Sequence, residues 1–346
     1  MSEACAVTAP AADDAVVDRD WLKIVGAYRH PNIYRSVFEI VVSAVPFVIF
    51  WVLAYLALDV GYWLTLLLAI PAAGFVLRLF LIQHDCGHLA FFNSRAANNW
   101  VGRVLGVFTM TPYEVWRRSH ATHHATSGNL DKRGVGDIDT LTVREFLAMS
   151  KWQRLRYRLY RHPLVMFGLG PAYIFLLHQR LPFGQMKDGW RPWLSAMGTN
   201  LSMAVLFGAI IWVTGWKAFV MVHIPIVVIA ATVGIWLFYV QHQFEDTYWA
   251  HSPEWEHQTA ALLGSSYYEL PPVLRWFSAN IGIHNVHHLY SRIPYYRLPE
   301  VLRDYPELAG VRHIKFLDGF KECVLKLWDE EKRRLVPYSE LRQQGI

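Results

Sequence analysis

The segment from Tyr62 to Ile82, YWLTLLLAIPAAGFVLRLFLI, runs through Gln83 directly into His84-Asp-Cys-Gly-His88. An apolar segment of this length can cross a bilayer, which takes about 20 helical residues. Two histidines four positions apart share one face of a helix. The sequence therefore predicts a membrane-spanning helix that carries a pair of imidazoles at one end.

Three more segments are long and apolar enough to span a bilayer, at about Ser36 to Leu58, Trp193 to Thr214 and Lys217 to Val240. Only residues 59–61 separate the first two spans, and only residues 215–216 separate the last two. Connections this short force two helical hairpins with both turns on the same side of the membrane. The content of 53% hydrophobic and 18% charged residues agrees with a membrane protein.

Charge assigns the two sides of the membrane. Basic residues gather between spans two and three, from Arg95 to Arg161, whereas the tight turns offer only Lys217. The positive-inside rule then places the long connections and both termini in the cytoplasm. We expect an all-α integral membrane protein with four transmembrane helices in two hairpins and a cytoplasmic helical cap, located in the bacterial inner membrane.

Two further histidine sequences fall on the same side: His120-Ala-Thr-His123-His124 and His284-Asn-Val-His287-His288. The three sequences supply eight imidazoles, more than one tetrahedral zinc needs, so we expect a two-metal site in the cap. A lack of oxygen ligands disfavours calcium and magnesium, while copper, zinc and iron stay open on ligand type. Cys86 could be a soft ligand, but its position between His84 and His88 favours packing.

The rest of the chain divides into three predicted parts: a disordered tail over residues 1–20, a membrane domain with its cap over 21–300, and a helical cytoplasmic segment over 301–346. Within the last part, Phe316, Phe320, Val324 and Leu327 form a helical stripe that predicts a helix from Ile314 to Leu335. The first 18 residues lack the basic and apolar regions of a secretory signal.

Shorter apolar stretches from Trp100 to Met110 and from Leu164 to Leu177 predict interfacial, re-entrant or cap segments. The basic and aromatic run from Arg154 to Arg161 favours a contact with anionic lipid over RNA binding. We expect no nucleic-acid partner, because the basic residues form no compact domain despite a net charge of +5.

The three histidine sequences, His-x3-His, His-x2-His-His and His-x2-His-His on one side of two hairpins, resemble those of the membrane fatty acid desaturase superfamily. The resemblance covers the chain from span one to about Glu300. The first sequence with its continuation to Phe92, the tail after His288 up to Pro299, and the segment from Gly136 to Val143 are most similar to the acyl-lipid Δ12 (omega-6) and omega-3 branch.

The resemblance implies a ninth metal-ligating histidine between the fourth span and the third histidine sequence. His242 occupies the matching place, with His251 and His257 as weaker candidates. His223 is expected to be structural. Carboxylates and amides near the ligands are expected to orient the imidazoles by accepting their other N–H group. The candidates for this orienting role are Asp85, Asp137, Asp139, Glu245 and Asn280.

The same resemblance implies two iron ions, O2 as co-substrate and desaturation of a fatty acyl chain, and we expect Δ12 of a lipid-linked oleoyl group as the position. The spans and cap would enclose a kinked apolar tunnel for that chain. Because the sequence has neither a flavin or nicotinamide fingerprint nor a cytochrome b5 motif, we expect an external ferredoxin or cytochrome-like carrier, served by its own reductase.

Several alternatives stay open at this point. A Δ9 or omega-3 desaturase, or a hydroxylase or ketolase acting on acyl chains, carotenoids, sterols or alkanes, would use the same scaffold. A membrane metal transporter or a haem-anchoring protein is disfavoured, because their ligands lie within the spans and the spans here are mostly bare of polar groups.

Overall fold

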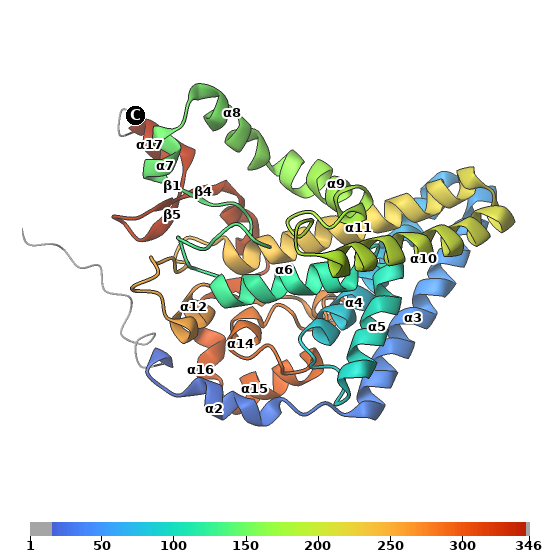
Figure 1. Cartoon of the computed structure of the whole chain (residues 1–346), viewed down its shortest axis with the longest axis horizontal. Coiled ribbons are helices and arrows are strands. Elements are labelled where there is room, and N and C mark those ends of the chain that lie inside the picture. The colour runs from blue at the N-terminus through green and yellow to red at the C-terminus, as the bar shows by residue number, and fades with distance from the viewer. Residues whose placement is uncertain (1–15, 344–346) are drawn as a thin grey trace, which may run out of the picture.

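The computed structural model describes residues 16–343. Four long helices form two hairpins, and most of the remaining elements gather at their other end, on the left of Figure 1. We call this remaining part, residues 16–32, 88–189 and 243–343, the cap. The long helices are α3 (Ile33–Leu56), α4 (Tyr62–Gly87), α10 (Trp190–Thr214) and α11 (Trp216–His242).

All four predicted spans are present. At a rise of about 1.5 Å per residue, helices of 24 to 27 residues cover the roughly 30 Å apolar core of a bilayer. Helix α4 is the central one, because 61% of its most apolar window is buried, against 11% in α10. The protein is therefore a membrane protein whose helix α10 turns mainly toward lipid.

The two hairpin turns are as short as expected. The 3-10 helix η2 (Ala57–Asp59) joins α3 to α4, and Gly215 alone joins α10 to α11. Gly215 has a φ of +80°, a left-handed conformation that costs glycine nothing and most residues more. This residue allows the chain to reverse direction without a longer loop.

The cap is built from short helices around the ends of α4 and α11. These are α2 (Trp21–Val25), α5 (Arg95–Phe108), α6 (Tyr113–Thr126), α7 (Val143–Ala148), α8 (Lys151–Tyr160), α9 (Gly170–Leu176), α12 (His257–Leu263), α13 (Pro272–Phe277), α14 (His284–Leu289), α15 (Leu298–Asp304), α16 (Glu307–Gly310) and α17 (Tyr338–Gln343). Short 3-10 and π-helical segments complete it: η1 (Gly26–Tyr28), the π-helical η3 (Val165–Leu169), η4 (His178–Arg180), η5 (Tyr295–Arg297) and η6 (Asp318–Val324).

Two small sheets tie distant parts of the cap together. β1 (Leu141–Thr142) pairs in parallel with β4 (Leu325–Asp329), which pairs antiparallel with β5 (Arg334–Pro337). β2 (Tyr267–Glu269) pairs in parallel with β3 (His313–Lys315). The C-terminal part of the chain thus belongs to the cap.

The helix predicted from Ile314 to Leu335 is wrong. The segment forms the end of β3, the 3-10 helix η6, β4 and the start of β5. Leu325 and Leu327 are buried, and Lys326 between them is also largely buried, so both faces of the central strand β4 are covered. The partner strands of β4, at residues 141–142 and 334–337, override the helical spacing of the apolar residues.

The disordered tail predicted over residues 1–20 does not extend to residue 20. Within the described residues, Gln258 donates its side-chain amide to the main-chain oxygens of Val17 and Arg19. Trp21 is fully buried. The chain therefore packs against the cap from residue 16 onward, and residues 1–15 lie outside the described part.

Candidate metal centre

The three histidine sequences meet where α4 ends. α4 carries His84 near its last residue, and His88 caps it. α6 carries the second sequence and α14 the third. His242, the last residue of α11, joins them. All nine predicted ligands lie together, although they come from four helices far apart in the chain.

The nine imidazoles fall into two groups, each with its ligand nitrogens within 4.8 Å of one another. One group is His84, His88, His120, His124 and His287, and the other is His123, His242, His284 and His288. The rings of His124 and His288 stack between the groups with centroids 4.1 Å apart. The arrangement has the form of two adjacent metal sites.

Helical geometry explains how one sequence serves both groups. Residues four apart on a helix differ by about 40° in direction, whereas neighbouring residues differ by about 100°. His120 and His124 therefore point to the same group, while His123 points to the other. On α14, His284 and His288 share a group and His287 turns to its neighbour.

Separations between ring nitrogens match those of ligands on one metal. With metal–nitrogen bonds of about 2.0–2.1 Å, ligands at right angles lie about 3 Å apart. The Nε2 atom of His120 lies 3.0 Å from that of His88 and 3.1 Å from that of His124. In the second group, the Nε2 atoms of His284 and His242 lie 2.9 Å apart. The Nε2 atoms thus converge as a coordination shell requires.

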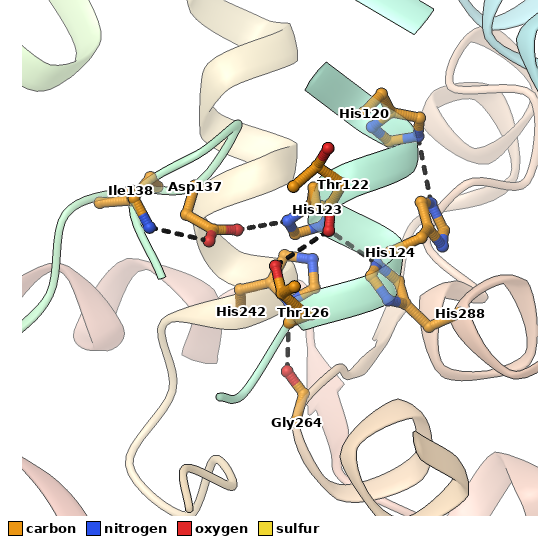
Figure 2. A network of polar contacts seen from close by, with 12 residues as sticks. His120, Thr122, His123, His124, Thr126, Asp137, Ile138, His242, Gly264 and His288 are labelled. Atoms are coloured by element: carbon orange, nitrogen blue, oxygen red, sulfur yellow. Dashed lines mark hydrogen bonds and ion pairs between the residues drawn. The ribbon is translucent and has the colours of Figure 1, made fainter. Parts of the chain in front are cut away.

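Three of the nine imidazoles contact a neighbouring residue through their Nδ1 atom. His242 donates its Nδ1–H to the main-chain oxygen of Gly264 at 3.1 Å, so its Nε2 lone pair faces the group. Asp137 binds Nδ1 of His123, as Figure 2 shows, and Asp85 lies 3.2 Å from Nδ1 of His84. These contacts set the tautomer and the direction of the ring.

The protonation state also suits metal binding. Burial, reinforced by repulsion from neighbouring histidines, holds the pKa of six cap imidazoles well below the usual value near 6.5. At neutral pH these rings are uncharged and their lone pairs are free to bind a metal. The six are His88, His120, His124, His284, His287 and His288.

A cavity of about 1020 Å³ reaches the first group and touches the second. His84, His120 and His284 line one part of it. Apolar side chains of α4 and α11 form part of its walls, among them Val76, Leu77, Phe80, Leu81, Val227 and Leu237, and the larger share of the lining comes from residues between 109 and 188. At the upper end of the roughly 300–1,000 Å³ typical of ligand sites, the cavity can hold a long apolar ligand against the histidines.

Comparison with known proteins agrees with this arrangement. The model of the family described as fatty acid desaturase matches residues 61–317, which is more than half of the chain. The chain belongs to the fatty acid desaturase family. It is an oxidoreductase that desaturates fatty acyl chains, and its histidine groups together with its family indicate a metal centre.

Individual relatives of this desaturase differ in how closely they match. A protein of Bacillus subtilis named fatty acid desaturase is 42% identical over 320 residues, covering 92% of this chain and 90% of that protein. An sn-1 acyl-lipid omega-3 desaturase (ferredoxin) of Synechocystis is 28% identical over 230 residues, covering 63% of this chain and 60% of that protein. An sn-1 oleoyl-lipid 12-desaturase of Anabaena variabilis is 26% identical over 253 residues, covering 70% of this chain and 69% of that protein.

Three of the predicted orienting residues lie elsewhere in the desaturase. Glu245 pairs with Arg334, and Asn280 donates to the main-chain oxygen of Tyr295. Asp139 contributes its main-chain oxygen to Arg161. Within the described residues, none of the three side chains forms a hydrogen bond or ion pair with any of the nine histidines, so the structure does not bring them to the ligands as it brings Asp85 and Asp137. Closeness in sequence did not fix the direction of these side chains.

Several contacts at the site have no signal in the sequence. Trp116 stacks on His120 with ring centroids 4.6 Å apart, and the main-chain N–H of Tyr295 donates to Asp85 at 2.7 Å. The Gly264 oxygen that holds His242 is a main-chain atom. Such partners depend on tertiary packing, and the two main-chain partners could belong to almost any residue type.

The remaining candidates fall outside the two groups. His251 pairs with Asp131 and Glu330 at the surface, and His257 begins α12. His223 is buried in α11 between Phe207 and Phe219. Cys86 is buried in the main core cluster, as its predicted packing role requires.

Proposed function

We propose that the nine grouped histidines hold two iron ions that use O2 to introduce a cis double bond into a lipid-linked acyl chain. Two observations support this: the separation of the imidazoles into two adjacent groups, and the contact of both groups with one apolar cavity. Imidazole ligands suit iron, and family membership favours iron over copper and zinc.

Iron, when bound, would supply the activation of O2 and the attack on an unactivated C–H bond, which no side chain can perform. Removal of one hydrogen from each of two neighbouring methylenes, with two external electrons and two protons, reduces O2 to two waters. The chain's own residues hold the histidine rings and orient the acyl chain. Asp137, Asp85 and the Gly264 oxygen fix the rings, and the cavity walls position the acyl chain and keep water away.

For the position of the double bond, we propose Δ12 desaturation of a lipid-linked oleoyl group. The oleoyl-lipid 12-desaturases of Anabaena and Synechocystis, 26% and 28% identical, support this choice. Omega-3 desaturation is the second candidate, because omega-3 desaturases of cyanobacteria and plants match about as well.

We further propose an external electron donor on the cytoplasmic side of the inner membrane. The Synechocystis relative is named with ferredoxin, and the cap of this chain carries the basic residues. An acidic carrier would be drawn to that surface. The positive-inside rule supports a cytoplasmic location for the cap and both termini.

Fatty acid profiling tests the proposed function. The chain is expressed with a ferredoxin and its reductase in a host that makes oleate but no polyunsaturates, and double bonds are located by gas chromatography–mass spectrometry. We expect 18:2 to appear at the expense of 18:1, and to be absent with His284→Ala. New 16:1 or 18:1, or a hydroxylated acid, would overturn the proposed position or reaction, and feeding 18:2 tests for an omega-3 product.

A further inference from the structure

Helix α8 exposes large apolar side chains along the middle of its outward face. Trp152, Leu155 and Leu159 are 79%, 44% and 54% exposed. Their spacing places them within about 60° of one another around the helix. Tyr157, on the opposite side, is buried and donates its hydroxyl to the main-chain oxygen of Lys326. A helix facing only water would expose its polar side chains and bury its apolar ones.

Basic residues border this apolar stripe on both sides. Lys151 and Arg158 lie along one edge and Arg156 along the other, and all three are exposed. Within the described residues, none of the three forms an ion pair with an acidic side chain. Long basic side chains beside an apolar stripe are typical of helices that lie in the surface of a membrane.

Arg161, the last residue of the basic run from Arg154 to Arg161, does not face outward. Arg161 is buried and donates to Gln243 at 2.7 Å and to the main-chain oxygen of Leu325 at 3.1 Å. It therefore anchors the inner side of the segment to the cap. Of the three exposed basic residues of α8, Arg158 also lies over the rings of Phe146 and Tyr338, so Lys151 and Arg156 are the ones most available to a partner.

The apolar surface continues from α8 toward the spans. Figure 1 shows α8 and α9 following each other along one side of the molecule to the flank of α11. Beyond α8, large apolar side chains stay exposed as far as the lipid-facing helix α10. They are Leu164, Leu169, Tyr173 and Leu177, followed by Trp190 and Leu194.

Contacts with α11 set the depth of this segment. Thr232 donates its hydroxyl to the main-chain oxygen of Phe167 at 2.8 Å, and the rings of Phe167 and Trp236 lie 5.2 Å apart. Thr232 stands ten residues before His242, or about 15 Å along the helix. The turn η3 thus lies well up the span, whereas the preceding helix α8 contacts β4 through the Tyr157 hydroxyl.

From these observations we propose that α8 is an interfacial helix that binds the anionic headgroups of the bilayer, with η3 and α9 dipping into its apolar layer. Trp152, Leu155 and Leu159 insert among the acyl chains, and the flanking basic residues bind headgroup phosphates. Because Tyr160, Val165, Met166, Leu169 and Tyr173 also line the cavity, the segment separates the cavity from lipid.

A soluble electron carrier is the competing occupant of this face. An acidic carrier would fit the basic residues. It would not account for the exposed apolar stripe of α8 or for the exposed apolar side chains that recur along the chain as far as α10. The observations favour lipid, and the carrier becomes an outcome of the test.

Spin-label depth measurement tests the proposal without relying on catalysis. Leu155→Cys is labelled in a Cys5→Ser, Cys323→Ser background and reconstituted in vesicles of one part phosphatidylglycerol to three parts phosphatidylcholine. Accessibility to O2 and to a water-soluble nickel complex is compared with two reference labels, at Val205→Cys on α10 and at Glu331→Cys in the exposed turn between β4 and β5. We expect the label at position 155 to resemble the one at position 205 in its protection from nickel.

A label at position 155 as accessible to nickel as the one at position 331 would overturn the proposal. If added ferredoxin then protected it, the face would belong to the carrier. The role of the basic residues is tested with Arg156→Gln. Arg333→Gln, which removes one exposed positive charge elsewhere, is the matched control. Only Arg156→Gln should raise nickel accessibility at position 155, and only in vesicles with phosphatidylglycerol. Equal effects of both variants, or no effect, would overturn the role of anionic headgroups.

Discussion

His123 lies between two partners that give it a single orientation. Its Nδ1 contacts Asp137 and its Nε2 lies 3.2 Å from that of His288. Asp137 can approach His123 because the preceding residue, Gly136, adopts a φ of +75°. A larger residue would not fit there, since its Cβ would lie only 3.0 Å from the main-chain oxygen of Ser119. A loop residue and a glycine thus direct a histidine of another element.

Replacement of Asp137 should weaken the metal centre specifically. In Asp137→Ala, His123 loses the acceptor that fixes its ring, and metal affinity or activity should fall about 10- to 100-fold. Iron retention during dialysis against a chelator measures this effect. Asp139→Ala is the matched control, because among the described residues the Asp139 side chain forms no hydrogen bond or ion pair with a histidine. Equal iron loss in both variants would mean that the Asp137 contact has no role of its own.

Glu322 predicts a pH effect on stability away from the metal centre. Burial raises the pKa of its carboxyl from an ordinary 4.5 to about 7, aided by repulsion from Glu245 and Asp246. The folded protein then binds more protons than the unfolded chain between these pH values. The stabilisation by the protonated carboxyl is complete below about pH 4.5 and is lost as pH rises through about 7.

Thermal unfolding from pH 5 to 8 measures this contribution. Wild type should lose stability over this range relative to Glu322→Gln, which cannot ionise. Glu331→Gln, at an exposed position, should follow wild type. Parallel curves for wild type and Glu322→Gln would show that the carboxyl ionises normally.

At the scale of elements, the hairpin of α3 and α4 is locked by charges inside the membrane domain. Glu39 of α3 and Arg78 of α4 are almost fully buried and form an ion pair. Glu39 also accepts the Tyr295 hydroxyl at 2.9 Å, and Arg78 donates to the main-chain oxygen of Trp276. The pair thus ties the first hairpin to the cap.

Glu39→Ala should destabilise the protein by about 3–5 kcal/mol, because Arg78 would stay buried without its partner. Arg35→Ala, which removes a half-exposed partner of Glu39, should cost less than about 1 kcal/mol. Denaturation in detergent compares the two variants. The double change Glu39→Leu, Arg78→Met should recover much of the loss, and a double variant as unstable as Glu39→Ala would contradict this account.

Elements differ in how far sequence could predict them. The spans and the histidine helices were predictable because both depend on local patterns, apolar length and three- or four-residue spacing. The segment from Ile314 to Leu335 was not, because β4 pairs with β1 across more than 180 residues. Non-local pairing leaves no trace in the spacing of Phe316, Phe320 and Val324.

At the scale of the whole molecule, the fold serves to place polar ligands against an apolar cavity. The hairpins hold α4 and α11 side by side, and the cap brings α6 and α14 to their ends. Sequence could place the nine histidines on one side of the membrane. It predicted two metals but could not show which histidines form each group or that one cavity reaches both groups.

The most direct test of the central claim is the metal content of purified, active protein, measured by mass spectrometry together with activity. The two histidine groups predict about two irons per chain, and His242→Ala should lose iron from the second group together with activity. Active protein with one iron per chain, or with zinc or copper in its place, would contradict the account.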